Sequence, residues 1–364
     1  MTPFFGDAFG NASSVHWYGQ QARLALERAR ATIARALGAH PAELTFTSGG
    51  TESDNFAIRG VFCAARKRGR THIVTTAAEH HAVLDCVEAL RGEGADVTIL
   101  PVDSSGRVAP DAVGGAIGER TCLVTVMHAN NEVGTISDIA AIADLAHRQG
   151  VLLHTDAVQS FGKVTVNVQE LGVDLASVSA HKIYGPKGIG ALYIRRGTEI
   201  ENIFWGGGQE RGRRPGTENV AFAAGFARAA EIALEGMKEQ SSQVQVLRNS
   251  LEEKLRLEFP GLLTNGHSVE RLPHILNVSF GFPPFVPEGE MLLLNMDLEG
   301  IAVSSGSACT SGSVQPSHVL IAMGRDRATA KATIRFSFGR SNTPDDVDTA
   351  VTALKMVAAR MKAV

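Results

Sequence analysis

One cysteine of this chain differs from the other three in its surroundings. Cys63, Cys86 and Cys122 lie in the apolar stretches GVFCAAR, VLDCVEAL and TCLVTVM, which is typical of small buried side chains. Cys309 lies instead in SSGSACTSGS, residues 304–313, among serines and glycines that favour exposed backbone. An exposed thiolate is a nucleophile, although it is also open to oxidation. The contrast makes Cys309 the candidate reactive thiol.

A second candidate site is the turn TSGGTESDN, residues 47–55, which follows a strand-like run. Its glycines, Gly49 and Gly50, and the hydroxyl of Thr51 precede a helix that we expect to start near Glu52. Free backbone N–H groups at a helix start, together with the helix dipole, suit a phosphate group. An ordinary capped strand–helix turn would have the same appearance.

Two further stretches place ionisable side chains at the ends of strand-like runs. Asp156 ends such a run in HTDAVQS, where a carboxylate needs a charged or hydrogen-bonding partner or serves as a helix cap. Lys182 follows one in SVSAHKIYGPKGIG; a desolvated lysine there could form a Schiff base, and a surface loop lysine is the alternative. GPKGIG lacks the spacing of a P-loop.

His80 and His81, in AEHHAVLD, open a predicted helix. Adjacent helical residues do not face one direction, so the pair is a poor metal site, but one ring could lie against an aromatic cofactor. Together, a phosphate turn, an imidazole, a strand-end aspartate and a lysine match what pyridoxal 5'-phosphate requires. The lysine binds its aldehyde, the aspartate keeps its ring nitrogen protonated, and the turn holds its phosphate.

The elements that must position these residues alternate along the first two hundred positions. Strand-like runs, separated by helical stretches, occupy residues 71–77, 95–102, 121–129, 150–157, 175–180 and 190–196. This alternation predicts an α/β fold with a mostly parallel sheet covered on both faces, in which ligands bind at the carboxyl ends of the strands. Residues 20–38 and 219–258 show helical spacing, and the former end at Gly38, a plausible cap.

Strand-like runs return near the C-terminus at residues 274–280, 300–306 and 332–338. We therefore expect a large domain, 1–237, and a smaller α+β domain, 238–364, which carries Cys309 and is joined to the first by a long helix near 237–258. The 364 residues carry a net charge of −3, which gives no support for nucleic-acid or anionic-membrane binding. Without a CxxC pair, a signal peptide or a long apolar run, we expect a cytoplasmic protein with no metal site.

The chain resembles the cysteine desulfurases of the NifS and IscS type, which are fold-type I pyridoxal-phosphate enzymes of the class V aminotransferase group. The matching stretches span nearly the whole chain in the family's order: TSGGTESDN, EHHAVLD, MHANNEVG, HTDAVQS, SAHKIYGPKGIGALY, GGGQERGRRPGTENV, SSGSACTSGS and IRFSFGR. Two departures are the missing DNAATTP-like segment before FGNASSVH and an early C-terminus, which leaves docking to a scaffold protein open.

The resemblance implies a role for each matching residue. Lys182 would bind the cofactor covalently, Asp156 would pair with its ring nitrogen, Gln159 with its ring hydroxyl, and His80 would stack on the ring and assist proton transfer. The phosphate would be held by Gly50, Thr51, Ser179 and His181, and by Thr217 from the neighbouring subunit of a homodimer. Asn131 would lie beside the cofactor and help hold the substrate, whose carboxylate Arg335 would bind with its planar fork.

The resemblance also implies the reaction. Sulfur from L-cysteine would pass to Cys309 as a persulfide, alanine would be released, and the sulfur would travel on to an acceptor protein for uses such as iron–sulfur cluster assembly or tRNA thiolation. A selenocysteine or cystine lyase, an aminotransferase, or an inactive cofactor-binding interaction protein are the alternatives. The first three need no protein thiol, so Cys309 argues against them. The sequence does not identify the acceptor.

Overall fold

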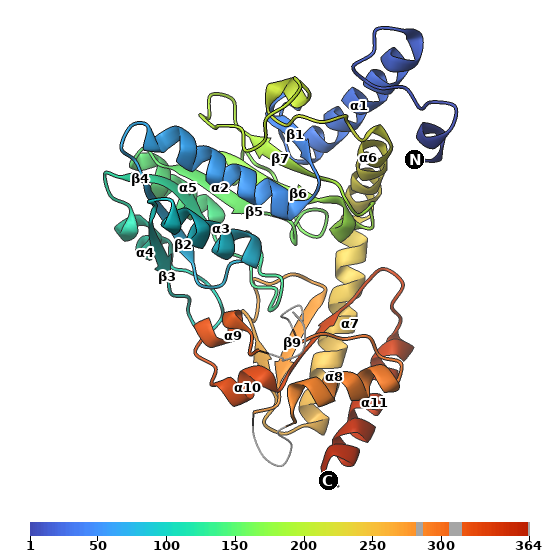
Figure 1. Cartoon of the computed structure of the whole chain (residues 1–364). Helices are drawn as coiled ribbons and strands as arrows, with labels where there is room; N and C mark the ends of the chain where they lie inside the picture. The colour runs from blue at the N-terminus through green and yellow to red at the C-terminus, as the bar shows by residue number, and fades with distance from the viewer. Residues whose placement is uncertain (282–286, 306–314, 363–364) are drawn as a thin grey trace. The chain divides into compact units, whose positions relative to one another are not determined.

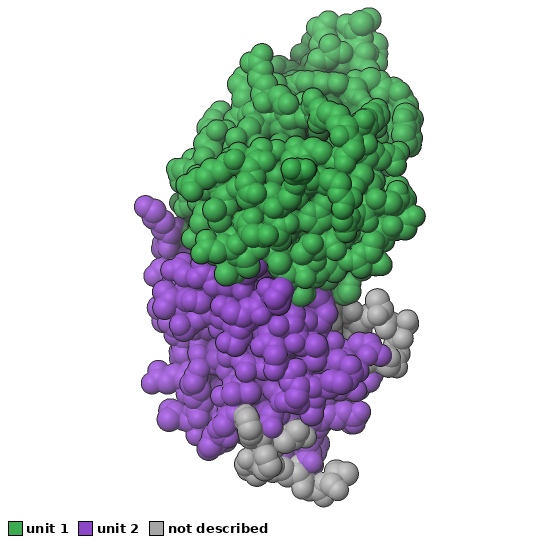
Figure 2. Space-filling view, turned by 90° about the vertical axis from the view of Figure 1, so that its left-hand side faces the viewer, with its two compact units in different colours: residues 1–100, 109–128, 138–237 green, residues 101–108, 129–137, 238–364 purple. Residues whose placement is uncertain are grey.

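The protein was analysed as a computed structural model, which describes residues 1–281, 287–305 and 315–362 (Figure 1). Its contacts divide the chain into two compact units, coloured separately in Figure 2. Unit 1 comprises residues 1–100, 109–128 and 138–237, and unit 2 comprises 101–108, 129–137 and 238–364. Two short segments therefore group with the C-terminal part of the chain although they precede it in sequence. Cys309 lies outside the described residues.

Unit 1 is built on a seven-stranded sheet, counted over the described residues, with the order β1-β7-β6-β5-β4-β2-β3. The strands are β1 (Leu44–Thr47), β2 (His72–Thr76), β3 (Asp96–Leu100), β4 (Thr121–Thr125), β5 (Leu152–Asp156), β6 (Leu175–Ser179) and β7 (Gly190–Ile194). Neighbours from β3 to β6 pair in parallel, and β7 is antiparallel to both β6 and β1. Strand β1 therefore runs in the same direction as β6, and every strand except β7 ends at one edge.

The strands of unit 1 are connected by helices that cover the sheet. The α-helices are α1 (Trp17–Ala36), α2 (Gly50–Arg66), α3 (His81–Gly92), α4 (Pro110–Ala116), α5 (Ile139–Arg148) and α6 (Val220–Glu235), and short 3-10 turns are η1 (Thr2–Phe5), η2 (Pro41–Glu43), η3 (Ala180–Ile183) and η4 (Glu210–Gly212). Apolar side chains of α2 and α3, including Phe56, Phe62 and Leu90, pack with sheet residues such as Leu123 and Leu192. Figure 1 shows α2 and α3 side by side over the sheet.

Unit 2 contains a three-stranded antiparallel sheet, counted over the described residues, in the order β10-β9-β8. Its elements are α7 (Met237–Glu258), β8 (Leu263–Asn265), β9 (Ile275–Ser279), α8 (Gly289–Leu298), α9 (His318–Ala322), α10 (Arg327–Lys331), β10 (Thr333–Ser337) and α11 (Pro344–Lys362). Its core joins Leu251 of α7, Leu292 of α8 and Leu354 of α11 to Leu276 and Ile334 of the sheet. Within the described residues, no helix has the length and apolarity needed to cross a membrane.

The predicted architecture is confirmed: the large sheet is mostly parallel, and the C-terminal region mixes helices and strands. One predicted strand is wrong. Residues 301–305, from GIAVSSG, make only an isolated bridge between Ser304 and Arg335. The apolar part of this run is only three residues long, and the serines and glycine that follow favour turns over a ladder. Helix α2 begins at Gly50, two residues before the expected start at Glu52.

Gly38 and Gly69 both have the left-handed backbone conformation, but only Gly38 lies close to another side chain. Comparing them distinguishes the cost of backbone strain from the cost of steric contact. Gly38, just after α1, has φ +69°, and a Cβ there would lie 2.5 Å from Asn167 Oδ1. Gly69 has φ +76° with no atom within 4 Å of such a Cβ. We expect Gly69→Ala to lower the free energy of unfolding by about 1–2 kcal/mol through strain alone, and Gly38→Ala to lower it clearly more. Urea denaturation measures both, and equal losses would contradict the steric contribution.

Candidate active site

Most of the sequence-predicted site residues of unit 1 meet at the carboxyl edge of its sheet. Following β1, β2, β4, β5 and β6 in turn, the edge carries Ser48, then Glu79 and His80, then His128, then Asp156, and finally His181 and Lys182. The strand directions bring these positions together, because all of these strands end on the same side. Asn131 and Arg335 belong to unit 2.

The turn after β1 leads directly into α2, whose first residue is Gly50. Its N-cap is Gly49, and no side chain caps the helix, so backbone N–H groups of the first turn remain available for an anion. A Cβ on Gly50 would lie 2.7 Å from Val158 Cγ2. Glycine at this position therefore allows the helix start to approach the segment that follows Asp156, while Thr51 is exposed beside it.

Asp156, the last residue of β5, is buried, with 6% of its surface exposed. One carboxylate oxygen, Oδ1, accepts a hydrogen bond from Val158 N at 2.8 Å, and the backbone oxygen accepts one from His128 N at 2.9 Å. Burial raises the pKa of Asp156 to about 6, against the opposing effects of the Val158 hydrogen bond and the nearby Lys182 charge. A cationic partner would stabilise this carboxylate. Gln159 is half-buried three residues further on.

Lys182 lies in the 3-10 turn η3, which follows β6 without a break. Ser179 Oγ and His181 Nδ1 are 2.8 Å apart. Burial lowers the pKa of His181, with further lowering by Lys182 and Lys187, so the lysine lies close to both His181 and Asp156. The turn closes on Tyr184 at φ +63°, a left-handed conformation that costs a non-glycine residue energy and often occurs at functional sites.

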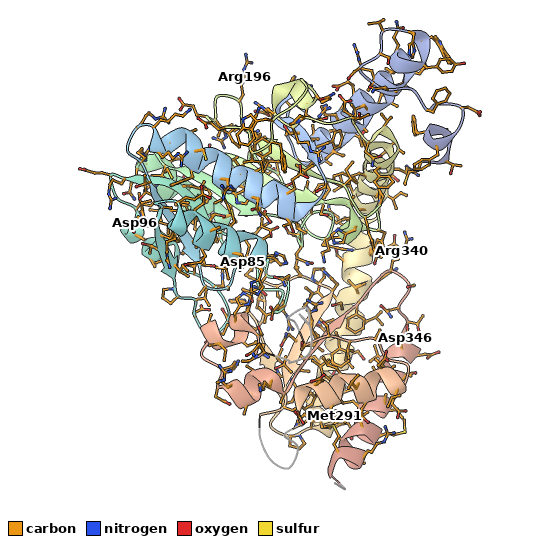
Figure 3. All side chains as sticks on the ribbon, viewed as in Figure 1. Asp85, Asp96, Arg196, Met291, Arg340 and Asp346 are labelled. Atoms are coloured by element: carbon orange, nitrogen blue, oxygen red, sulfur yellow. The ribbon has the colours of Figure 1, made fainter. Side chains whose placement is uncertain are left out.

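His80 and His81 differ in orientation. His80 is the N-cap of α3, and its ring Nδ1 accepts a hydrogen bond from Ala82 N at 3.1 Å. His81 Nδ1 lies 3.2 Å from Asp85 Oδ1, on the face of α3 where Figure 3 labels Asp85. The structure thus separates the two rings, as expected for adjacent residues, and fixes His80 at the end of the helix that meets the sheet edge.

Sequence reasoning missed Glu79, which directly precedes His80. Its side chain is fully buried, and Oε1 accepts hydrogen bonds from Thr76 Oγ1 at 2.7 Å and Met127 N at 3.1 Å. Burial raises the pKa of Glu79 to about 8, opposed by these two hydrogen bonds and increased by the charge of Asp156. The signal in the sequence is a glutamate directly after the small apolar residues of TTAAE, where burial is expected.

A second missed group lies below Asp156, between α2 and the sheet. His154 Nδ1 is 2.8 Å from Thr125 Oγ1, and its Nε2 is 3.0 Å from Ser177 Oγ and 3.6 Å from Asp54 Oδ1. Burial lowers the pKa of His154 to about 3 and raises that of Asp54 well above its usual range, an effect that the Asp156 charge increases and the Ser177 hydrogen bond opposes. His154 is therefore neutral near neutral pH, and burial shifts Asp54 toward its protonated form.

Unit 2 contains an arginine with unused hydrogen-bonding capacity. Arg335 Nη1 donates to the Asn131 carbonyl oxygen at 2.7 Å, while its buried Nε has no hydrogen-bond partner among the described residues. Burial lowers the pKa of Arg335, and the charge of Glu132 opposes this effect. A half-buried guanidinium with an unsatisfied donor is suited to a carboxylate. Asn131 and Arg335 are thus brought together within unit 2.

Thr217 is exposed on the loop between β7 and α6. It lines a cavity of about 210 Å³ with Ser48, Gly188 and Arg214 among other residues. Arg214 binds Glu52 in the first turn of α2, with nitrogen–oxygen distances of 2.9 and 3.3 Å. Burial raises the pKa of Glu52, but the hydrogen bonds from Arg214 and Ser48 outweigh this effect and hold the pKa below its usual value.

Two of the three described cysteines, Cys86 and Cys122, are poor nucleophiles. Cys86 and Cys122 are buried, and burial raises the pKa of their thiols to about 12 and about 11, respectively. Cys63 is half-buried, which is more exposed than its apolar neighbours in the sequence indicated. Because the thiolate is the reactive form, Cys86 and Cys122 are almost wholly in the unreactive thiol form near neutral pH.

Comparison with known proteins gives consistent results. The family described as Aminotransferase class-V matches residues 1–350. A relative from Dictyoglomus turgidum named cysteine desulfurase IscS is 44% identical over 364 residues, covering 100% of this chain and 91% of the relative. A solved structure titled NIFS-like protein superposes with a TM-score of 0.90 at 38% identity, covering 100% of this chain and 94% of that one. Another, SspA in complex with cysteine, has a TM-score of 0.80 at 36% identity and covers 94% of each chain.

The buried Glu79 makes a prediction about stability. Its usual carboxyl pKa of 4.5 is raised to about 8 in the folded chain, so between about pH 4.5 and about pH 8 the unfolded chain is ionised at this position while the folded chain retains its proton. Stability is lost as the pH rises through this range, by at most about 1.4 kcal/mol per pH unit for one group. We expect Glu79→Gln to remove that contribution.

Urea denaturation of the cofactor-free protein between about pH 6.5 and about pH 8 measures this slope. Glu88→Gln, at an exposed position of the following helix α3, serves as the matched control and should keep the wild-type slope. An unchanged slope in Glu79→Gln would contradict a buried, protonated Glu79.

Proposed function

The chain belongs to the aminotransferase class-V family and, within it, to the cysteine desulfurases, and on this premise we propose that it uses pyridoxal 5'-phosphate to transfer the sulfur of L-cysteine to Cys309. The observation that carries the proposal is the carboxyl edge of the large sheet. There an uncapped helix start, a buried carboxylate and a lysine surround one position. A helix start can bind an anion, a carboxylate can bind a protonated ring nitrogen, and a lysine can bind an aldehyde.

The residues at this edge fit the cofactor. The N-terminus of α2 at Gly50 and Thr51, together with Ser179 and His181, would hold the phosphate, and the Ser179–His181 hydrogen bond orients both side chains. Lys182 would hold the aldehyde carbon, and Gln159 would hydrogen-bond the ring hydroxyl. His80, fixed as the cap of α3, would lie against the ring. Thr217 would reach the phosphate site of the second subunit, so the proposed enzyme is a homodimer.

Asp156 would hold the ring nitrogen in its protonated form. Its carboxylate is buried, and burial raises its pKa to about 6. Because water cannot solvate the buried carboxylate, a cation in direct contact would stabilise its ionised form. When bound, the cofactor withdraws electrons from the substrate's α-carbon and so makes the bond between Cβ and sulfur easier to break. Lys182 and His80 would carry protons to and from the substrate carbon atoms.

Unit 2 would recognise the substrate. Arg335 has a buried Nε without a partner among the described residues, and its other end is tied to the backbone of Asn131. A substrate carboxylate would satisfy that donor. The Asn131 side chain lies on the same short segment and would help to hold the bound amino acid. The structure of SspA in complex with cysteine supports an amino acid of this kind as ligand of a related protein.

The sulfur step needs no oxidant or reductant besides L-cysteine and the enzyme thiol. The Cys309 thiolate attacks the substrate sulfur, an S–S bond forms, and the substrate's Cβ–S bond breaks. The electron pair of that bond stays on Cβ, which takes up a proton, so that the products are alanine and a persulfide. An acceptor protein would then remove the terminal sulfur. The cytoplasmic location and the transfer of sulfur to an acceptor protein stay predictions.

Replacement of the proposed nucleophile tests the function directly. Cys309→Ser should still bind L-cysteine, seen as a change in the visible spectrum of the bound cofactor, because the groups of unit 1 are intact. It should form no persulfide, because serine is neither ionised near neutral pH nor able to carry sulfur. Mass spectrometry after brief exposure to L-cysteine should locate one added sulfur on Cys309 in the wild type.

Cys86→Ala and Cys122→Ala serve as matched controls, since both thiols are buried and held protonated. Both variants should retain most of the turnover. Alanine production by Cys309→Ser at the wild-type rate, or added sulfur on another cysteine, would show that the nucleophile is misassigned.

The role of Arg335 has its own test. Arg335→Lys keeps a positive charge but loses the planar fork, so one charge-assisted hydrogen bond to the substrate is lost. We expect KM for L-cysteine to rise roughly tenfold to a hundredfold, the equivalent of about 1.5–3 kcal/mol, while cofactor content stays unchanged. Arg271→Lys, at an arginine of unit 2 that is paired with Glu252 at 2.7 Å, is the control. An unchanged KM in Arg335→Lys would remove it from the substrate site.

A further inference from the structure

The loop of residues 204–219, which carries Thr217, contains a strained turn that the proposed function does not explain. Glu210 and Arg211 adopt φ values of +47° and +59° in succession. Residues other than glycine rarely adopt this left-handed conformation, and two in a row persist only where surrounding contacts fix them. The loop also contains several glycines, which would otherwise let it adopt many conformations.

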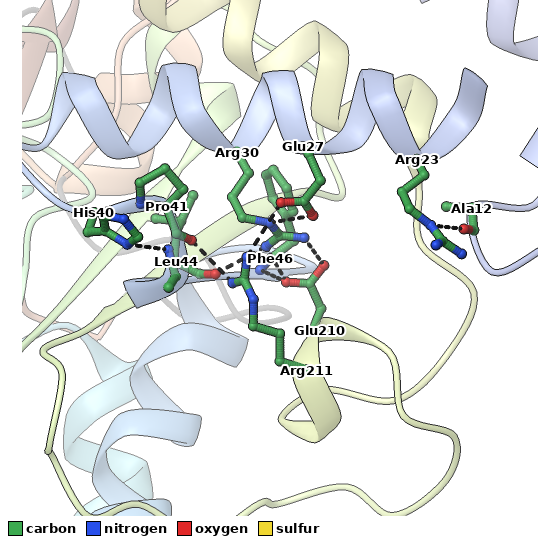
Figure 4. Close-up of polar contacts among 11 residues, drawn as sticks. Ala12, Arg23, Glu27, Arg30, His40, Pro41, Leu44, Phe46, Glu210 and Arg211 are labelled. Atoms are coloured by element: carbon green, nitrogen blue, oxygen red, sulfur yellow. Dashed lines mark hydrogen bonds and ion pairs between the residues drawn. The ribbon is translucent and has the colours of Figure 1, made fainter. Parts of the chain in front are cut away.

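The contact that fixes the turn is a buried ion pair, drawn in Figure 4. Arg30 of α1 donates from Nη1 to Glu210 Oε2 at 2.6 Å and from Nη2 to Oε1 at 2.8 Å. Phe46 N, in β1, donates to the same Oε2 at 2.9 Å, and Arg30 Nη1 also donates to the Leu44 oxygen at 3.1 Å. We call these four residues the Glu210 clamp.

The clamp is shielded from water. Arg30 and Glu210 are only 2% and 7% exposed, and the Arg30 guanidinium lies 4.8 Å from the centre of the Phe46 ring. A bidentate pair of this kind fixes direction as well as distance. Because either charge alone would be unstable in this environment, the pair ties the loop firmly to α1 and β1.

Further contacts connect the clamp to Thr217. Gln209 Oε1 accepts a hydrogen bond from Gly216 N at 3.1 Å, so the loop closes on itself just before Thr217. Arg214 holds Glu52 in the first turn of α2, and the Asn219 side chain caps α6 directly after the loop. Thr217 itself is exposed. All the contacts that hold the loop therefore lie within one subunit. They fix the backbone on both sides of Thr217 and so determine the position of its hydroxyl.

We propose that Arg30 and Glu210 are positioning residues for the cofactor site of the second subunit: the clamp fixes the 204–219 loop so that Thr217 reaches the partner's bound phosphate. The inference rests on the proposed function, in which Thr217 acts across a homodimer. A clamp with a purely structural role would affect its own subunit. The proposed clamp acts on the neighbouring site instead, and this difference can be measured.

Mixed dimers separate the two possibilities. Two differently tagged subunits are co-expressed, and one carries Lys182→Ala so that only the other holds the cofactor covalently. Glu210→Gln is placed either in the Lys182→Ala subunit or in the subunit that retains Lys182. The readout is the rate at which visible cofactor absorbance is lost after dilution into a carbonyl scavenger, relative to dimers without Glu210→Gln.

We expect loss to be at least tenfold faster when Glu210→Gln lies in the Lys182→Ala subunit, and close to the reference rate when it lies in the other. Equal rates in the two arrangements, or faster loss only in the second, would overturn the proposal. Glu252→Gln, which removes another carboxylate paired with an arginine, should give the reference rate in both arrangements.

Thr217→Ala in the same two arrangements tests the underlying function. Faster loss only when it lies in the Lys182→Ala subunit supports the role of Thr217 across the dimer, whatever the clamp does. If Thr217→Ala behaves in this way and Glu210→Gln does not, the clamp proposal fails while the proposed function stands. If Thr217→Ala has no effect in that arrangement, the role of Thr217 across the dimer fails and the clamp proposal falls with it.

Trypsin provides a second measurement that needs no cofactor. Arg211 and Arg213 lie in the loop, and cleavage after them requires the loop to leave its fixed conformation. We expect cleavage there to be several times faster in cofactor-free Glu210→Gln dimers than in wild type or Glu252→Gln. Wild-type resistance in Glu210→Gln would contradict the clamp. If Glu210→Gln does not fold, Arg30→Lys, which retains the charge but loses the fork, replaces it in both experiments with the same expected outcomes.

Discussion

Burial of carboxyl groups beneath the carboxyl edge of the large sheet is the constraint on which much of the site depends. Asp54, Glu79 and Asp156 are all almost fully buried, and burial raises the pKa of each. Their negative charges oppose one another, as the effect of Asp156 on the other two shows. A negative charge on any one of them is therefore opposed by charge on the others and would be favoured by a nearby cation.

The three carboxyl groups differ in the polar partners that surround them. Glu79 accepts hydrogen bonds from Thr76 and Met127, and Asp54 is hydrogen-bonded to Ser177 and lies near the neutral His154, so each has polar partners within the protein. Asp156 is the one at the strand end, and Lys182 lies close enough to lower its pKa. Under the proposed function, a cationic ring nitrogen would complete its environment.

The sequence predicted those site residues that can be recognised from their immediate neighbours in the chain. Asp156, Lys182 and the Gly49–Gly50 turn follow strand-like runs, and a parallel sheet brings strand ends together, so their grouping could be predicted. The roles of Asp54 and Glu79 could not, because they depend on which helix face is buried against which strand. The segment 300–306 was also misjudged, since its apolar part is only three residues long and the polar residues that follow favour turns, so it makes a single bridge to the edge strand β10.

The proposed reactivity of Cys309 is consistent with the effect of burial on the other thiols. The low-dielectric interior that holds carboxyl groups protonated also raises the pKa of the Cys86 and Cys122 thiols to values at which they cannot act as nucleophiles. A reactive thiol in this chain therefore has to lie outside the apolar core, among residues such as the serines and glycines around Cys309. The interior thus disfavours the thiolate forms of Cys86 and Cys122, and under the proposed function Cys309, on a polar segment of the chain, accepts the transferred sulfur.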